Sequence, residues 1–339
     1  MKVLLYYPIK NSEASNEGVR LLKNIRNALK LENIPYTTDV YDYYDVAHFI
    51  SPNFEKEIDI AKDKGIPVVI SAFYAEGWKD TSFLRYKNKN GHRFVTLSNK
   101  AFRVLNKVDL ILVPSEYNAR FLKDNGVTTK TKVCLSGLDL ESYKEENETD
   151  KYLFHHYFQE DEKQEYVLAF GDFTRGVEGL NAISRAAKKN PNLSFYFVGT
   201  QGDKNKLGLK DSKLVSSVPK NLHCVGELPE DIHRSAIKGT KLVIFPGYKP
   251  AGIITVEEAI ASNRQLIMRK SSVYPDLLVD GKTAYLAEFS ETIVSIIEDF
   301  ENRSQQPTTI EAYNVVKDCD LANYGKKLNS FYKSLLKAK

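Results

Sequence analysis

The sequence has few sulfur-containing residues, a single tryptophan and no long apolar run. Its 339 residues include three cysteines, two methionines and one tryptophan. Cys134, Cys224 and Cys319 lie far apart, without the paired spacing of metal-binding or redox motifs, so we expect three buried, reduced thiols. No segment reaches the roughly 20 apolar residues that a membrane span needs. The opening MKVLLYYPI has one basic residue and no cleavage-like site, which favours a strand over a secretory signal.

A strong excess of charge of one sign is also absent. The formal net charge is +4, with 48 basic and 44 acidic residues, so the total does not suggest nucleic acid as a partner. Among the six histidines, His155 and His156 are adjacent. Neighbouring side chains on a helix point in different directions, so we expect two surface residues and no metal site there. The protein is expected in the cytoplasm, where it can still lie on a membrane surface.

Short apolar runs alternate with helical patterns through the first half of the chain. The pattern runs KVLLYYPI, GVRLLKNIRNALKLENI, YDVAHFI, NFEKEIDIAKDKG, IPVVISAF, a helix ending AFRVLNKV, DLILVPS, EYNARFLKDNG and KTKVCLSGL. Ser115 is placed to cap the helix that follows it, and Gly126 to end it. Strands alternating with helices predict a parallel sheet with helical crossovers.

The same alternation restarts after a polar connecting stretch that holds a short helix. The strands expected in the second half are EYVLAFGDF, LSFYFVG, LHCVG, TKLVIFPG and RQLIMRK, and helices are expected between and after them. We therefore expect two Rossmann-like, doubly wound α/β domains, residues 1–148 and 149–321, with a final helix at about 322–339 packing back on the first. Such domains bind ligands at the carboxyl ends of their strands, in a cleft that two of them would share.

Two loops of the second half have the chemistry of an anion site. GDFTRGVEG (171–179) offers backbone N–H groups ahead of a helix, and Arg175 adds a donor fork suited to phosphate. An ordinary structural turn is the alternative for this loop. In KPAGIITVEEA, Gly252 allows close approach to a ligand, and Ile253 begins a helix whose Glu257 can accept hydrogen bonds from ribose hydroxyls. The alternative is a helix with favourable acidic residues in its first turns.

The second half offers a third loop, and the first half offers one more candidate. The loop at 226–230 can pass a nucleobase and ends at Glu230, and His233 is expected to be a surface or packing residue on the following helix. In the first half, Asn16 and Gly18 belong to a polar loop that an acceptor or phosphate can approach.

The segment 79–132 is basic, with twelve Lys or Arg against four Asp or Glu and aromatic residues interleaved. It is either a solvated helix face or a surface for anionic lipid headgroups, to which each cation contributes about 1 kcal/mol. No recognised nucleic-acid motif accompanies it. The residues expected to form this basic patch are Trp78, Arg85, Lys87, Lys89, Arg93, Lys100, Arg103 and Lys107.

Several segments together resemble the retaining glycosyltransferases of family four, which have the GT-B fold. They are YDVAHFI, KVDLILVPSEYNARFLKDNGV, NLHCVGELPEDIHRSA and the run from GIITVEEAIAS to SSVYPDLLVDGKTAYL. Within that family the chain looks most like bacterial diacylglycerol glycolipid glycosyltransferases that add a second hexose. The resemblance implies a UDP-sugar donor in the C-terminal domain and a glycolipid or other glycan acceptor in the N-terminal domain. It also implies retention of configuration, no metal and no cofactor beyond the donor substrate.

The resemblance also assigns residues and shows departures. Glu257 takes the position of the second glutamate of the family's E-x(7)-E pattern, the one that binds ribose, whereas Lys249 stands at the first. Using Glu258 instead puts Pro250 there. The family's Arg-Lys phosphate pair appears as Thr174-Arg175, and Phe73 stands where a histidine often contacts the donor sugar. The implied donor-binding residues are Thr174, Arg175, Glu230, Lys249, Gly252, Ile253 and Glu257.

These departures leave two hypotheses open. In the first, Lys249 supplies positive charge to the diphosphate and the protein is a working hexosyltransferase. In the second, it is a degenerate, non-catalytic GT-B protein that partners an active glycosyltransferase. A polysaccharide or protein-glycan transferase without membrane contact is a third class. Homo- or hetero-oligomers are compatible with each.

Overall fold

The computed structural model describes most of the chain. The described residues are 1–8, 17–74, 83–87, 93–144, 150–171, 179–199, 217–247, 253–270, 276–301 and 307–338. They divide into two compact units. Of the described residues, the first unit takes in 1–8, 17–138 and those from 319 onward, and the second takes in those between 139 and 318. Each unit is built around a six-stranded parallel sheet, which confirms the expected α/β class with two doubly wound domains.

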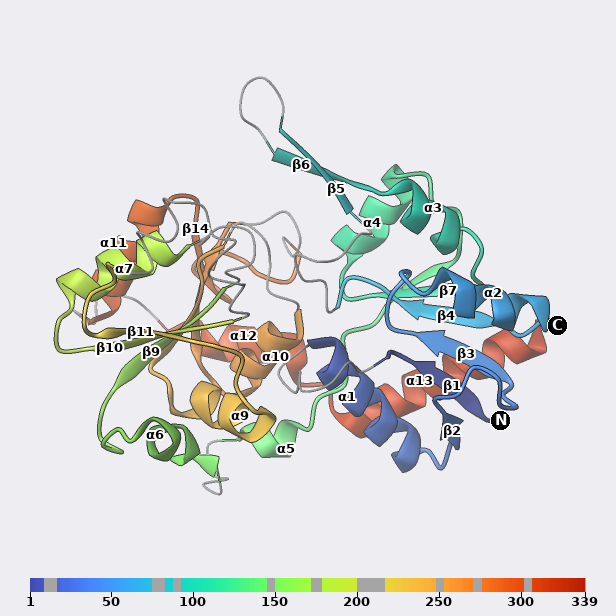
Figure 1. Cartoon of the computed structure of the whole chain (residues 1–339), viewed down its shortest axis with the longest axis horizontal. Helices are drawn as coiled ribbons and strands as arrows, with labels where there is room; N and C mark the ends of the chain where they lie inside the picture. Colours follow the sequence, from blue (N-terminus) through green and yellow to red (C-terminus); the bar gives the residue numbers. More distant parts are fainter. Residues whose placement is uncertain are drawn as a thin grey trace. The chain divides into compact units, whose positions relative to one another are not determined.

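The first unit places helices on both faces of its sheet, whose strand order is β2-β1-β3-β4-β7-β8 (Figure 1). Its elements are β1 (Val3–Tyr6), α1 (Glu17–Leu31), β2 (Tyr36–Thr37), β3 (Val46–Phe49), α2 (Glu55–Asp63), β4 (Val68–Ser71), β5 (Phe83–Lys87), β6 (Arg93–Leu97), α3 (Asn99–Leu105), β7 (Leu110–Val113), α4 (Glu116–Asp124), β8 (Thr131–Val133) and α13 (Leu321–Lys337). The antiparallel pair β5 and β6 forms a separate two-stranded sheet, which the sequence analysis did not predict.

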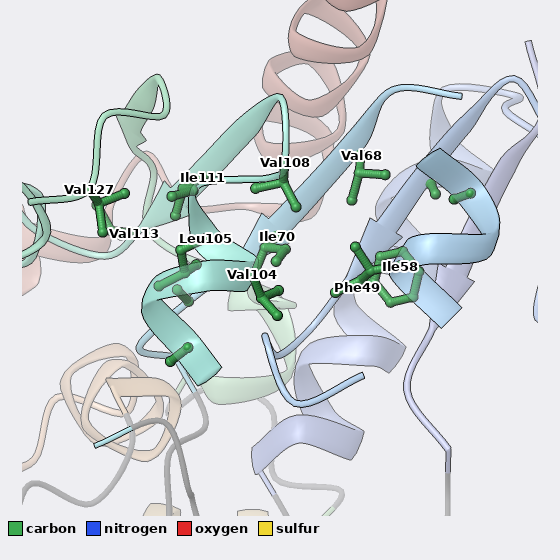
Figure 2. Packing of buried hydrophobic residues seen from close by; sticks show 14 of the residues in the cluster. Phe49, Ile58, Val68, Ile70, Val104, Leu105, Val108, Ile111, Val113 and Val127 are labelled. Carbon is green, nitrogen blue, oxygen red and sulfur yellow. The ribbon is translucent and has the colours of Figure 1, made fainter. Parts of the chain in front are cut away.

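The two faces of the first sheet have separate cores. On one face, aliphatic side chains of α2 and α3, such as Ile58 and Val104, pack with Phe49 and Ile70 of the strands (Figure 2). On the other face, His48 of β3 is fully buried and contacts Tyr332 of α13. Because both faces are covered, the inner strands β1, β4 and β7 are nearly continuous apolar runs rather than alternating patterns.

The predicted start and end of α4 are confirmed. The Ser115 hydroxyl accepts a hydrogen bond from the Asn118 backbone N–H, so it satisfies one of the donors left open at the helix start. Gly126, directly after the C-cap, has φ of 81°, a left-handed conformation that glycine adopts without steric cost. The side chain and the backbone thus fix both ends of a nine-residue helix.

The second unit repeats this architecture with the strand order β11-β10-β9-β12-β13-β14. Its elements are α5 (Leu140–Tyr143), α6 (Leu153–Phe158), β9 (Tyr166–Phe170), α7 (Leu180–Lys189), β10 (Ser194–Val198), β11 (Leu222–Val225), α9 (Glu230–Gly239), β12 (Leu242–Phe245), α10 (Ile253–Ala261), β13 (Gln265–Arg269), β14 (Tyr285–Ala287), α11 (Ser290–Glu301) and α12 (Thr309–Val316). Helices α7 and α11 cover one face, while α6, α9 and α10 cover the other.

One expectation about the histidines is wrong. His155 is 4% exposed rather than at the surface, because its ring packs on Tyr166 and its Nε2 lies 3.1 Å from the Gln164 carbonyl oxygen. His156, which points elsewhere on α6, is exposed and pairs with Glu162 as expected of a surface residue. The three cysteines are free thiols; Cys134 and Cys319 are buried and Cys224 is half-buried.

Candidate functional site

The strand order of the second sheet places a topological switch point between β9 and β12. From β9 the chain builds outward through β10 to β11, and it then returns to place β12 on the other side of β9. Ligands of open α/β sheets bind beside the carboxyl ends of such a strand pair. Two of the three loops that the sequence analysis selected, in GDFTRGVEG (171–179) and KPAGIITVEEA (249–259), follow these two strands along the chain. The fold therefore brings the starts of both loops to one place.

An aromatic and histidine cluster lies where these two strands end. The rings of Phe170 and Phe245 are stacked, with centroids 5.5 Å apart and an interplanar angle of 20°. The His233 ring, on α9, lies 5.4 Å from the Phe170 ring. Phe245 is buried and Phe170 is half-buried, so the two rings present an apolar surface where the two strands end.

A buried pair of His233 and Glu258 stands beside this cluster. The His233 Nε2 atom lies 3.0 Å from a carboxylate oxygen of Glu258, and the two residues are 3% and 2% exposed. Glu257, the preceding residue of α10, is 1% exposed. Charged groups are rarely buried unless they are paired, so this pair is a specific feature of the site. His233 is a packing residue, as predicted, but its partner was not foreseen.

Two glycines allow neighbouring segments to pack closely at the same edge of the second sheet. Gly179, which precedes α7, has φ of 88°, and a β-carbon there would lie 2.6 Å from the ring of Pro246. At Gly199, after β10, a β-carbon would lie 1.5 Å from the Gly171 carbonyl oxygen. Any side chain at these positions would force the segments apart, so both positions require glycine.

Arg269 is a site residue that the sequence analysis missed. Its guanidinium, 3% exposed, donates to the carbonyl oxygens of Pro246 and Glu288 and to the Ser290 hydroxyl. The Pro246 contact, at 3.1 Å, holds the chain directly after β12. A buried arginine that pins a loop start has no local sequence signal, because its three acceptors become neighbours only in the folded sheet.

The predicted donor-binding residues divide between described and undescribed parts of the chain. Ile253 is the buried first residue of α10, and Glu230 is the half-buried first residue of α9. Both helices begin after strands of the same sheet, so these residues lie toward its carboxyl edge. Thr174, Arg175, Lys249 and Gly252 lie outside the described residues.

In the first unit, two predicted positions have a clear structural role. Gly18 is buried at the start of α1, where a β-carbon would lie 2.4 Å from the Tyr7 ring, so its small size permits that packing. Phe73, directly beyond β4, has φ of 70°, which costs a non-glycine residue about 1–3 kcal/mol, and its ring contacts Phe121 edge-on. Asn16 lies outside the described residues.

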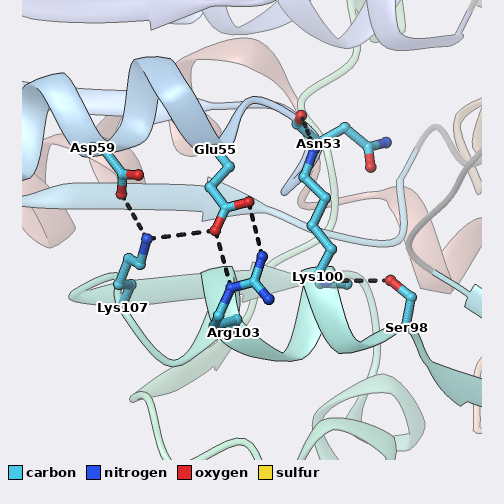
Figure 3. A network of polar contacts seen from close by, with 8 residues as sticks. Asn53, Glu55, Asp59, Ser98, Lys100, Arg103 and Lys107 are labelled. Carbon is cyan, nitrogen blue, oxygen red and sulfur yellow. Dashed lines mark hydrogen bonds and ion pairs between the residues drawn. The ribbon is translucent and has the colours of Figure 1, made fainter.

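The described cations of the basic patch are largely neutralised by α2. Figure 3 shows Arg103 donating twice to Glu55, at 3.2 Å, and Lys107 pairing with Asp59 at 2.7 Å. The hydrogen bond from Arg103 lowers the pKa of the Glu55 carboxyl. Lys100 donates to the Asn53 carbonyl oxygen at 3.1 Å.

The other patch residues are placed only by backbone or not at all. Arg85 and Lys87 belong to β5 and Arg93 to β6, whereas Trp78 and Lys89 lie outside the described residues. Within the described part of the chain, no group of three or more potential metal ligands comes together, and none of the helices is both long and apolar enough to cross a bilayer.

Comparison with known proteins identifies the domain that holds these residues. Residues 150–314 match the family described as Glycosyl transferases group 1. These residues form a glycosyltransferase group 1 domain. The switch point, the His233–Glu258 pair and Arg269 all belong to this glycosyltransferase domain. Over the whole chain, the protein is 27% identical to a processive diacylglycerol alpha-glucosyltransferase of Acholeplasma laidlawii, with all of both chains covered.

Solved structures show the GT-B fold for the whole chain. The HepE protein of Anabaena in complex with UDP-glucose aligns with a TM-score of 0.69 at 15% identity, over 98% of this chain and 100% of that one. A sucrose-phosphate synthase of Thermosynechococcus elongatus aligns with a TM-score of 0.71 at 10% identity, over all of both chains. The glycosyltransferase domain is therefore the second of two Rossmann-like domains.

Proposed function

We propose that the protein transfers a hexose, glucose or galactose, from a UDP-sugar to a glycolipid acceptor at a membrane surface. The observation that carries the proposal is the buried acidic pair Glu257 and Glu258 on α10, directly beyond the switch point of a glycosyltransferase group 1 domain. Carboxylates held at that edge suit ribose hydroxyls, because each can accept two hydrogen bonds. The full-length relative, a diacylglycerol glucosyltransferase, makes diacylglycerol glycolipids the first acceptors to test.

The donor's diphosphate requires positive charge beside it. We assign this role to Arg175, supported by Thr174, and to Lys249. The backbone N–H groups at Gly252 and Ile253 add the positive end of the α10 dipole. Glu257 would hold ribose and Glu230 would lie beside the nucleoside. Stabilising the charge that develops on departing UDP is the main catalytic requirement, and these cations would meet it without a metal. The transfer is proposed to retain the anomeric configuration.

The acceptor is proposed to approach the first unit, near Asn16 and Gly18, with the basic patch on the lipid surface. Arg103 and Lys107 already pair with acidic residues of α2. The electrostatic attraction to an anionic lipid surface would therefore come mainly from the other cations of the patch. Each remaining cation near an anionic surface would contribute about 1 kcal/mol. The proposed location is peripheral, on the cytoplasmic face of a membrane.

The test uses the full chain with radiolabelled UDP-glucose or UDP-galactose and vesicles that contain monohexosyl-diacylglycerol. We expect labelled dihexosyl lipid, unaffected by EDTA, with the anomeric configuration of the donor in its NMR spectrum.

Glu257→Gln should lower kcat/KM at least tenfold, the effect of a lost charged hydrogen bond of about 1.5–3 kcal/mol. Glu311→Gln, an exposed position on α12, is the matched control and should leave the rate unchanged. Absence of both transfer and hydrolysis with every UDP-hexose would contradict the proposal.

The second candidate, a non-catalytic partner of another glycosyltransferase, is favoured by Lys249 and Pro250 in place of the family's first glutamate. Restoring the carboxylate with Lys249→Glu separates the two. A working enzyme that uses Lys249 at the diphosphate should lose activity, whereas a degenerate site should gain some. Calorimetric titration adds an independent measurement, because a working donor site should bind one UDP-sugar more tightly than UDP.

A further inference from the structure

A groove along α13, bounded on its other side by Glu32 directly after the end of α1 and called here the α1–α13 groove, has no role in the proposed transfer. Its volume is about 510 Å³. It is lined by Glu32, Lys326, Asn329, Ser330, Lys333, Ser334 and Lys337. Figure 1 shows the two helices side by side, α1 in blue and α13 in red. Apart from Glu32, all of these residues belong to α13, so one helix supplies most of the groove's chemistry.

The three lysines of this groove form one stripe. Lys333 is seven residues after Lys326 and four before Lys337, and at about 100° per residue these spacings keep all three within roughly 40° of one another around the helix. All three are exposed. Among the described residues none of them is in an ion pair, in contrast to Arg103 and Lys107, which α2 neutralises. The stripe therefore presents positive charge that the fold leaves uncompensated.

The opposite wall of the groove is held in place by close packing. Gly325 allows α13 to approach α1 so closely that a β-carbon there would lie 2.7 Å from the Ala28 carbonyl oxygen and 3.0 Å from the Glu32 side chain. Across this contact, the Asn329 amide donates to a Glu32 carboxylate oxygen at 2.8 Å. The carboxylate is thus fixed at one side of the groove with acceptor capacity left, since an ionised carboxylate has about four acceptor sites.

We propose that the α1–α13 groove binds a phosphate ester that also carries free hydroxyl groups. Lysine ammonium groups and the hydroxyls of Ser330 and Ser334 are donors suited to phosphate oxygens, whereas Glu32 can accept only from a donor such as a polyol hydroxyl. A simple anion would satisfy the lysines but would be repelled by Glu32. A glycerol phosphate group satisfies both walls, whether it is a soluble ester or the headgroup of phosphatidylglycerol.

The experiment compares two triple variants of the full chain. Lys326→Gln/Lys333→Gln/Lys337→Gln removes the stripe. Lys188→Gln/Lys282→Gln/Lys317→Gln removes three exposed lysines of the second unit and lowers the net charge equally. Binding is measured by calorimetry with glycerol 3-phosphate, and by sedimentation with vesicles of phosphatidylcholine alone or mixed equally with phosphatidylglycerol. All six positions are exposed, so both variants should fold, which circular dichroism checks.

We expect the stripe variant to bind at least tenfold more weakly than the wild type, and the control variant to stay within twofold. Saturable binding of glycerol 3-phosphate that shows this difference supports the groove as a site for a soluble ester. The same difference with phosphatidylglycerol vesicles alone supports it as a headgroup site. Equal losses in both variants, or no loss in either, would overturn the proposal. Neither probe contains a nucleotide sugar, so the result is independent of the proposed transfer.

Discussion

At the scale of single residues, the contact between His233 and Glu258 is the clearest test of the site. His233→Phe keeps an aromatic ring against Phe170 but leaves the Glu258 carboxylate buried without that partner. Losing one partner of a buried hydrogen bond costs about 1–3 kcal/mol, so urea unfolding should show a loss of this order. If the proposed donor site is correct, KM for the UDP-sugar should rise as well, because Glu257 is the adjacent residue of α10.

Two further variants control this result. His233→Gln keeps an N–H donor and should lose less than His233→Phe. Combining His233→Phe with Glu258→Gln removes the buried carboxylate and should recover part of the loss. If Phe and Gln at position 233 are equally destabilising, packing rather than the hydrogen bond accounts for the effect.

The second prediction at this scale concerns pH. Burial lowers the pKa of His48 from 6.5 to about 3, and its two ring nitrogens lie 2.7 and 2.8 Å from the hydroxyls of Tyr332 and Ser71. The folded chain keeps this imidazole neutral where the unfolded chain protonates it. The resulting stability is fully present above the unfolded pKa and declines as pH falls from about 6.5 toward 3.

Between pH 7 and pH 5, His48 should therefore account for a loss of about 2 kcal/mol in unfolding free energy. We expect His48→Gln to be less stable than the wild type at pH 7 but to lose less on acidification. Paired urea denaturation at the two pH values measures this difference. If wild type and variant lose the same unfolding free energy between pH 7 and pH 5, His48 does not account for the pH dependence in this range.

Some residues were predictable from local sequence and others were not. Ser115 and Gly126 act within one helix, so their cap and stop follow from neighbours a few positions away. Glu258 lies 25 residues from His233, and Arg269 reaches the Pro246 carbonyl across two adjacent strands. Nothing local marks these partners, because the strand order that joins them is decided by the whole sheet.

At the scale of elements, the packing of α13 on α1 reverses the usual effect of glycine in a helix. Gly→Ala inside an exposed helix stabilises by about 1 kcal/mol. At Gly325 the added carbon would meet the Ala28 carbonyl oxygen, and relieving such crowding typically costs about 1–3 kcal/mol. We expect Gly325→Ala to be destabilising in urea unfolding. Ser330→Ala, an exposed position on the same helix, should stay within about 0.5 kcal/mol. Stabilisation by Gly325→Ala would mean that the two helices can separate without cost.

The sequence analysis missed the β5–β6 hairpin because of its mixed composition. Phe83–Lys87 and Arg93–Leu97 each mix basic with apolar and aromatic residues, and this mixture favoured a charged surface rather than a structural interpretation. The two runs pair antiparallel, with Phe83 opposite Leu97, and Asn90-Gly91, which stands between them in the sequence, is a hairpin signal that the sequence analysis did not use. Elements with buried strands were easier to predict, since a continuous apolar run is itself the signal.

At the scale of the whole molecule, both sheets were predictable as parallel because strands and helices alternate along the chain. The order of the strands was not predicted, yet this order places the switch point between β9 and β12 and so selects two loops out of many. The sequence analysis selected these two loops from their glycine, arginine and glutamate content, together with a third at 226–230. Chemistry and topology thus converge on one edge of the second sheet.

Nucleotide binding at that edge should stabilise the second unit selectively. A ligand at 100 times its Kd stabilises the fold that binds it by about 2.7 kcal/mol. Hydrogen exchange with saturating UDP should therefore slow at the amides of β9, β12 and α10, where the proposed diphosphate and ribose contacts lie. The strands β1, β3 and β4 are the internal control, because they belong to the core of the other unit and should exchange as before. Protection confined to the first unit would contradict this prediction, because it would place the nucleotide site on the first sheet. Equal protection of both units would mean that UDP binding is coupled to the folding of the entire chain rather than to the α10 edge.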